Sequence, residues 1–190
     1  MPNNMTNKQK QNLLQFLGLY DGAIDGIWGP KSQAAMETVW AKYEDLDEEA
    51  ALLEAVSHWY PDEDLNSPIT GSWWDEIEFF DRSEFKCTCG GRGCNGFPAE
   101  PRERLVRNAN AARTHFGRPA DVSSGVRCQL RNSELPGSAA NSLHLTGRAM
   151  DFAIPGVSAA QLLAYVKTLP EVHEAYAIDG SYVHMGVEKY

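Results

Sequence analysis

The segment Ser142-Leu143-His144-Leu145-Thr146-Gly147-Arg148-Ala149-Met150-Asp151-Phe152 combines a histidine in a turn-like stretch with a carboxylate seven residues later. Asp151 falls within a predicted strand over 149–154, and a second histidine, His184, falls within another predicted strand over 182–187. Two imidazoles and one carboxylate are a ligand set typical of catalytic zinc, with a fourth position left for water. Residue types alone leave open the alternative that these residues bind no metal, because a histidine in a strand is more often simply packed.

The residues around this segment predict an α+β domain over 75–190. Helices are expected at 103–116, ended by Gly117, and at 158–169, where Ser158 and Gln161 form a capping box. A further short strand is expected at 121–127. Strands at 175–178 and 182–187 are expected to form a hairpin around Asp179-Gly180. Short strands joined mostly antiparallel predict a sheet around the zinc site.

The N-terminal residues predict a small all-α domain of three helices over 1–62. Helices are expected at 8–17, from Pro30 onward, and at 47–58. Two Asp-Gly pairs between the first and second helix predict tight turns. The acidic stretch 63–74 contains proline, asparagine, serine and glycine, and it predicts a linker.

Charge and hydropathy exclude two classes of partner. Residues 1–70 hold 4 basic and 12 acidic side chains, and residues 71–190 hold 13 and 14, so neither part has the basic excess of a nucleic-acid binder. No apolar run approaches the roughly 20 residues of a membrane span. The N-terminus lacks the basic and apolar pattern of a secretory signal. We therefore expect a monomer made in the cytoplasm, which reaches any external substrate only after release.

The four cysteines form a second chemical cluster. Three lie within eight residues among glycines, and the fourth follows Arg127; they are Cys87, Cys89, Cys94 and Cys128. Four thiolates can form a closed structural zinc site. The spacing Cys-x-Cys-x4-Cys is not that of a standard zinc finger, so disulfides formed after release and reduced thiols stay open as alternatives.

The C-terminal motif resembles the zinc D-alanyl-D-alanine carboxypeptidase family, which includes vancomycin-resistance peptidases and many phage endolysins. The resemblance rests on Ser142-x-His144-x-x-Gly147-x-Ala149-x-Asp151 followed by Val183-His184, and covers roughly 75–190. It implies that one catalytic Zn²⁺ is held by His144, Asp151 and His184. A second Zn²⁺, at the cysteines, would be structural.

The same resemblance suggests roles for other residues. Arg127, in Ser124-Gly125-Val126-Arg127, would hold a peptide carboxylate or the oxyanion, and Ser142 would contact the substrate. Family members place an acid or a histidine shortly before the last ligand, often at the position occupied here by Ser181, which cannot act as a base. Asp179 is the expected general base, although an Asp-Gly pair also simply shapes a hairpin turn. His173 is a less favoured candidate for the general base.

The N-terminal segment Leu17–Ser32, within 6–60, is similar to the common three-helix peptidoglycan-binding domain. Together the two resemblances imply a phage endolysin that binds bacterial peptidoglycan and cuts a D-alanyl-D-alanine-type bond with metal-activated water. The alternatives are an L-alanyl-D-glutamate endopeptidase on the same site, and a non-catalytic wall-binding protein with a structural metal.

Overall fold

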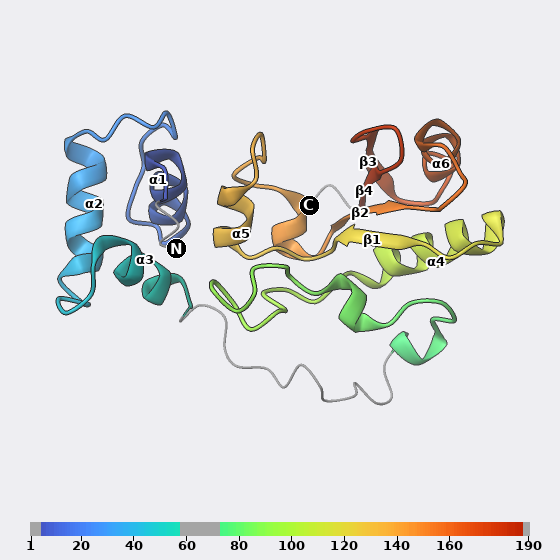
Figure 1. Cartoon of the computed structure of the whole chain (residues 1–190), viewed down its shortest axis with the longest axis horizontal. Coiled ribbons are helices and arrows are strands. Elements are labelled where there is room, and N and C mark those ends of the chain that lie inside the picture. Colours follow the sequence, from blue (N-terminus) through green and yellow to red (C-terminus); the bar gives the residue numbers. More distant parts are fainter. Residues whose placement is uncertain (1–4, 58–72, 188–190) are drawn as a thin grey trace. The chain divides into compact units, whose positions relative to one another are not determined.

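The computed structural model describes residues 5–57 and 73–187, and these residues form two compact units (Figure 1). The first unit contains residues 5–57, 89–96 and 128–142. The second contains residues 73–88, 97–127 and 143–187. Apart from Trp73 and Trp74, the predicted linker 63–74 lies outside the described residues.

Three helices of the first unit come from the N-terminal part of the chain. They are α1 (Asn7–Phe16), α2 (Pro30–Trp40) and α3 (Glu48–Ser57). Thr6 and Gln9 form a capping box at the start of α1, and Pro30 occupies the first turn of α2. The buried apolar side chains of this part include Leu13, Leu14, Met36, Val39 and Leu52.

A later segment of the chain belongs to the same unit. Helix α5 (Gln129–Glu134) packs against α1, and the Gln129 side-chain amide donates a hydrogen bond to Asn12. Hydrophobic periodicity gave no signal for this helix, because six residues are too few to show a period. The predicted domain 75–190 therefore contains two segments, 89–96 and 128–142, that pack with the N-terminal helices.

The second unit is built on a four-stranded sheet in the order β1-β2-β4-β3. Its strands are β1 (Asp121–Ser124), β2 (Ala149–Ala153), β3 (Val172–Ala177) and β4 (Val183–Val187). All three neighbouring pairs are antiparallel. The predicted α+β class with an antiparallel sheet is therefore confirmed.

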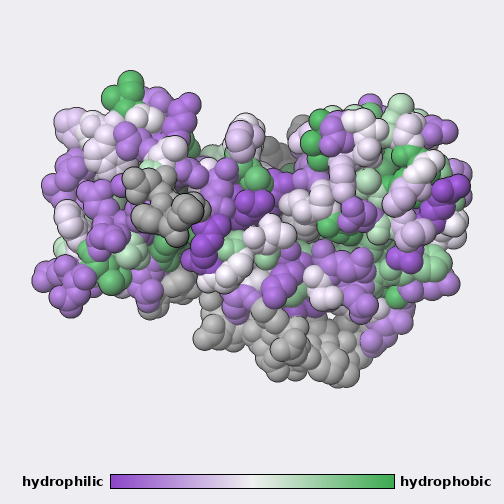
Figure 2. Space-filling view, viewed as in Figure 1, coloured by the Kyte–Doolittle hydropathy of each residue, from purple (hydrophilic) through white to green (hydrophobic). Residues whose placement is uncertain are grey.

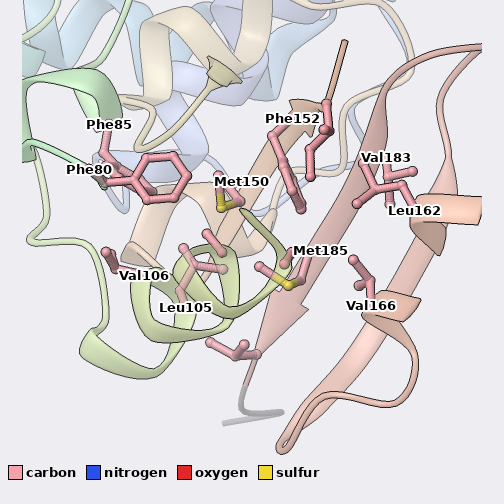
Figure 3. Packing of buried hydrophobic residues seen from close by; sticks show 14 of the residues in the cluster. Phe80, Phe85, Leu105, Val106, Met150, Phe152, Leu162, Val166, Val183 and Met185 are labelled. Atoms are coloured by element: carbon pink, nitrogen blue, oxygen red, sulfur yellow. The ribbon is translucent and has the colours of Figure 1, made fainter. Parts of the chain in front are cut away.

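Helices α4 (Glu103–Phe116) and α6 (Ala159–Val166) pack on β4, and three short 3₁₀ helices complete the unit: η1 (Trp73–Glu76), η2 (Arg82–Phe85) and η3 (Leu143–Thr146). The core between the helices and the sheet contains Met150 and Phe152 of β2 and Val183 and Met185 of β4 (Figure 3). Since successive side chains of a strand point to opposite faces, Asp151 and His184 belong to the other face of the sheet.

The predicted elements of this unit are largely confirmed. Helix α4 has the predicted bounds, Ser158 and Gln161 form the predicted capping box, and β3 pairs with β4 as the predicted hairpin. Strand β1 is shorter than predicted and ends at Ser124, because Gly125 and Val126 turn toward Phe85. Across the face shown in Figure 2, hydrophilic side chains predominate and hydrophobic ones are scattered. Within the described ranges, no helix combines the length and apolar character that crossing a bilayer requires.

Candidate functional site

Strand pairing brings Asp151 and His184 together. In the register of β2 and β4, Asp151 lies directly opposite His184. The same row continues to Ser124 on β1 and to Tyr176 on β3. Opposite residues in an antiparallel pair have Cβ atoms only about 4.5–5.5 Å apart, so this register places the carboxylate beside the imidazole.

His144 lies on η3 and reaches the same point. One hydrogen bond fixes its backbone and another fixes its ring. Its carbonyl accepts a hydrogen bond of 3.0 Å from the Arg127 amide. Its Nδ1 lies 2.7 Å from the Gly125 carbonyl oxygen, which can only accept. Nδ1 therefore carries the proton, and Nε2 presents a lone pair.

Two glycines of the motifs allow the close backbone contacts that this arrangement requires. A Cβ at Gly147 would lie 2.1 Å from the carbonyl oxygen of Glu100, and a Cβ at Gly125 would lie 2.3 Å from that of Phe85. Gly147 also adopts a φ of +69°, which favours glycine. The loop between the first two candidate ligands therefore depends on a residue without a side chain.

The three candidate ligands converge on one point. Asp151 Oδ1 lies 2.7 Å from His184 Nδ1 and 3.3 Å from His144 Nε2, and the two ring nitrogens are 3.3 Å apart. One ligand atom from each residue lies within 4.8 Å of the other two, and all three residues are at least 94% buried. Mixed nitrogen and oxygen donors in this number fit zinc with one coordination position left open.

The charges of the site suit metal binding. Burial lowers the pKa of His144, so its imidazole is neutral near pH 7, as a ligand must be. Burial alone would raise the pKa of Asp151, but hydrogen bonds with His144 and His184 and the charge of Arg127 lower it well below its ordinary value. Asp151 is therefore ionised near neutral pH, as a ligand of a divalent cation must be.

Arg127 lies beside the three ligands, 9% exposed. Its Nε donates to the Ser124 hydroxyl at 2.8 Å, and its terminal nitrogen donates to Asp151 Oδ2. A guanidinium has five N–H donors, so these contacts are compatible with the predicted binding of a substrate carboxylate or oxyanion. That role stays a prediction.

The structure places the other predicted site residues as follows. Ser142 is half-buried and lies two residues before His144. Asp179 is exposed in the hairpin turn, where its Oδ1 accepts the amides of Ser181 at 2.7 Å and Tyr182 at 2.8 Å. These hydrogen bonds, the one from Tyr182 first, lower the pKa of Asp179, which disfavours proton uptake near neutrality. The roles of Ser142 and Asp179 stay predictions, and His173 is an exposed residue of β3.

Two residues that sequence reasoning missed contact His184. The Tyr176 ring stacks on the imidazole at 4.6 Å between centroids, and Glu174 Oε1 lies 3.0 Å from Nε2. Burial, followed by the charge of Asp151, raises the pKa of Tyr176. Pairing the predicted hairpin symmetrically about Gly180 places Tyr176 opposite His184, whereas Glu174 lies outside the predicted strand 175–178.

The cysteines also come together. Their ligand atoms lie within 4.8 Å of one another, and the group consists of the buried thiols Cys87, Cys89, Cys94 and Cys128. The Sγ atoms of Cys89 and Cys94 are 3.6 Å apart, and Cys128 Sγ accepts the Arg131 amide at 3.4 Å. Around a zinc ion with Zn–S bonds near 2.3 Å, tetrahedral thiolates are about 3.8 Å apart, so the spacing fits a four-thiolate site.

Comparisons with known proteins agree with the chemistry of the histidine and aspartate group. The family model described as Peptidase M15 matches residues 78–186, which contain all three candidate ligands and exceed half of the 190-residue chain. Searches of curated proteins and of solved structures found no match. The buried ligand group and this match agree that the chain is a hydrolase of the metallopeptidase kind, and it belongs to the peptidase M15 family.

Proposed function

We propose that the protein is a zinc peptidase of the endolysin type, which hydrolyses a D-alanyl-D-alanine-type bond in bacterial peptidoglycan. The observation that carries the proposal is the convergence of His144, Asp151 and His184 within the matched family region. Zinc, the wall substrate, the phage setting and action after release from the host cytoplasm are parts of the proposal.

The residues present divide the chemistry among them. Zn²⁺, when bound, supplies a Lewis acid that polarises the peptide carbonyl and lowers the pKa of a water molecule toward neutrality. His144 and His184 contribute neutral nitrogens and Asp151 one negative charge, so the group leaves a net positive charge to act on the substrate. Arg127 orients Asp151 through their hydrogen bond and, in this proposal, also binds a substrate carboxylate. Asp179 stays the proton carrier predicted from the sequence, but its hydrogen bonds in the turn lower its pKa and favour a role in shaping that turn.

The N-terminal helices are proposed to bind the wall and to raise the local concentration of the peptidase near its substrate. Gln11 is buried and supports the loop before α2, because its side chain contacts Ile27 O at 2.9 Å and Gly26 N at 2.8 Å. In the same unit, α1 and the segment that follows α5 line a cavity of about 510 Å³. This cavity is the place where a wall fragment would fit.

Sedimentation of the full-length His144→Ala variant with insoluble peptidoglycan tests wall binding separately from hydrolysis, because this substitution leaves the cysteine group intact. The variant should sediment with the wall while releasing no fragments. A chain that stays in solution would contradict the proposed role of the N-terminal helices.

The cysteine group is proposed to hold a second, structural Zn²⁺. The four thiols supply all four positions of a tetrahedral site, so no position remains for water or substrate. Metal analysis of the purified protein should find two zinc ions per chain, and Cys94→Ser should reduce the count to one. A count of one in both proteins would contradict a second ion.

Digestion of purified peptidoglycan, followed by mass spectrometry of the fragments, tests the proposed activity. The wild type should release fragments cut at D-alanyl-D-alanine-type bonds. His144→Ala should release none, while His173→Ala, which removes an exposed imidazole, should behave like the wild type. Fragments cut between L-alanine and D-glutamate would favour the alternative endopeptidase, and equal release by His144→Ala would refute the metal mechanism.

A further inference from the structure

His184 is a buried candidate ligand on a central strand of the sheet. It is 3% exposed on β4 and has a strand on each side. Asp151 contacts it from β2, and Tyr176 stacks on its face from β3 with the two rings 13° from parallel. Asp151 constrains the direction of Nδ1, and Tyr176 constrains the plane of the ring. Neither contact involves the second ring nitrogen, Nε2.

The two nitrogens of His184 face different surroundings. Nδ1 faces the ligand group, 2.7 Å from Asp151 Oδ1 and 3.3 Å from His144 Nε2. Nε2 faces Glu174, whose Oε1 lies 3.0 Å away. His144 shows the same division, since its Nε2 faces the group and its Nδ1 faces the Gly125 carbonyl.

This division sets the protonation of each ring. A nitrogen that offers a lone pair to a cation leaves the proton of the neutral imidazole on the other nitrogen. The Nδ1–H of His144 donates a hydrogen bond to the backbone carbonyl of Gly125. In His184 the proton would be on Nε2, which is buried and makes no aligned hydrogen bond within the described residues. An outward N–H of this kind needs an acceptor, and Glu174 offers a carboxylate at ion-pair distance.

The sheet is built to admit Glu174 at this position. Glu174 lies opposite Gly186 in the β3–β4 register, and a Cβ at Gly186 would lie 3.3 Å from the Glu174 Cβ. Glycine therefore leaves room for the glutamate side chain beside His184. The carboxylate side chain is half-exposed, so a small rotation aligns it with Nε2 at little desolvation cost.

We propose that Glu174 is a positioning residue for His184. It accepts a hydrogen bond from Nε2–H, holds Nδ1 toward the metal and makes that nitrogen a stronger donor, as carboxylates behind metal-bound histidines do. The inference rests on the proposed function only in taking the convergent atoms of His144, Asp151 and His184 as the metal-facing ones. The side chain itself does not contact the substrate in this role.

Zinc affinity, measured by competition with a chromogenic chelator, tests the role without reference to activity. The measurements use the full chain and its variants His144→Ala, Glu174→Ala, Glu174→Gln and Glu78→Ala. Glu174→Ala should weaken zinc binding at this site by about 10- to 100-fold. Glu174→Gln should weaken it less, since an amide oxygen still accepts a hydrogen bond. Glu78→Ala removes the same charge from another exposed residue of the unit and should bind like the wild type.

The outcomes separate the inference from the proposed function. If the wild type binds zinc at a site that His144→Ala removes, but Glu174→Ala binds equally well, the positioning role is overturned and the metal site stands. Lost turnover with unchanged affinity would also overturn it, because Glu174 would then act on the substrate. If His144→Ala binds as much zinc as the wild type, the proposed function and this inference both fail. The Co²⁺-substituted spectrum should shift in Glu174→Ala and recover partly in Glu174→Gln.

Discussion

The described residues contain two buried groups of potential metal ligands, and the two groups are built in opposite ways. His144, Asp151 and His184 mix nitrogen and oxygen donors, and two of the three are on paired strands. The cysteine group has four sulfur donors, all outside helices and strands among turns and bends. The first group has two of its three ligands on paired strands of the sheet and the third on the adjoining helix η3, whereas the second has four ligands on loops that a metal would have to organise.

The difference shows that the number of ligands, and the elements that hold them, distinguish a catalytic metal site from a structural one. Three donors leave a coordination position that a substrate can approach, and the sheet together with η3 brings them together without help from an ion. Four thiolates would close the coordination shell of a bound ion, and the fold around them would then depend on that ion. Removing a ligand should therefore abolish turnover at the first group and stability at the second.

The largest expected effect is the loss of hydrolysis when a ligand of the first group is removed. His144→Ala should lower the rate of wall digestion by about 10³-fold or more, because metal polarisation contributes several kcal/mol. Its thermal unfolding should change far less than its rate. Fragment release over time measures the effect, with His173→Ala as the matched control. Retained turnover in His144→Ala would contradict a catalytic role of the first group.

The second effect is a loss of stability when the cysteine group is broken. Cys94→Ser should lower the free energy of unfolding by several kcal/mol, because a structural zinc site contributes directly to folding. Turnover per folded molecule should remain close to that of the wild type. Urea unfolding measures the stability, and the rate of wall digestion divided by the concentration of folded protein measures the turnover. A fully stable Cys94→Ser that has lost its activity would reverse the assignment of the two groups.

The third effect tests the backbone that supports the first group. Gly147→Ala should destabilise the fold by about 3 kcal/mol or more, since its Cβ would collide with the Glu100 carbonyl and the residue has positive φ. Gly117→Ala is the matched control: Gly117 also has positive φ, but a Cβ there meets nothing within 4 Å. Equal losses in the two variants would show that backbone conformation alone matters at 147.

The first group could be found from sequence because its residue types, their spacing and the family resemblance agreed. His144, Asp151 and His184 needed no knowledge of packing. Glu174 and Tyr176 were missed because their importance comes from strand register, which depends on the turn between β3 and β4. The association of 128–142 with the N-terminal helices was missed for a similar reason, since long-range packing decides it.

A smaller effect should appear in the pH dependence of stability. The pKa of His144 is lowered in the folded state, so the unfolded chain binds a proton near pH 6.5 that the folded chain does not. The free energy of unfolding should therefore fall as the pH is lowered from 7.5 to 5.5, by at most about 1.4 kcal/mol per pH unit for this group. Urea unfolding with a chelator present should show a shallower slope in His144→Ala, and parallel slopes would contradict this origin.

The smallest expected effect concerns Asp179. The turn contacts predict that Asp179→Asn keeps near-normal stability and turnover, because an amide oxygen can accept the Ser181 and Tyr182 amides. A general base cannot be replaced in this way, and its loss would cost about 10²- to 10⁴-fold in rate. Comparing the turnover of Asp179→Asn and Asp179→Ala decides between the two roles.

The row from Ser124 through Asp151 and His184 to Tyr176 crosses all four strands. A slip of β4 by one residue would turn His184 inward and expose Met185 in its place, because side chains alternate between faces. A partly mispaired molecule therefore cannot retain partial function. The specific activity of a preparation would count its correctly paired molecules, which makes hydrolysis a sensitive assay of refolding yield.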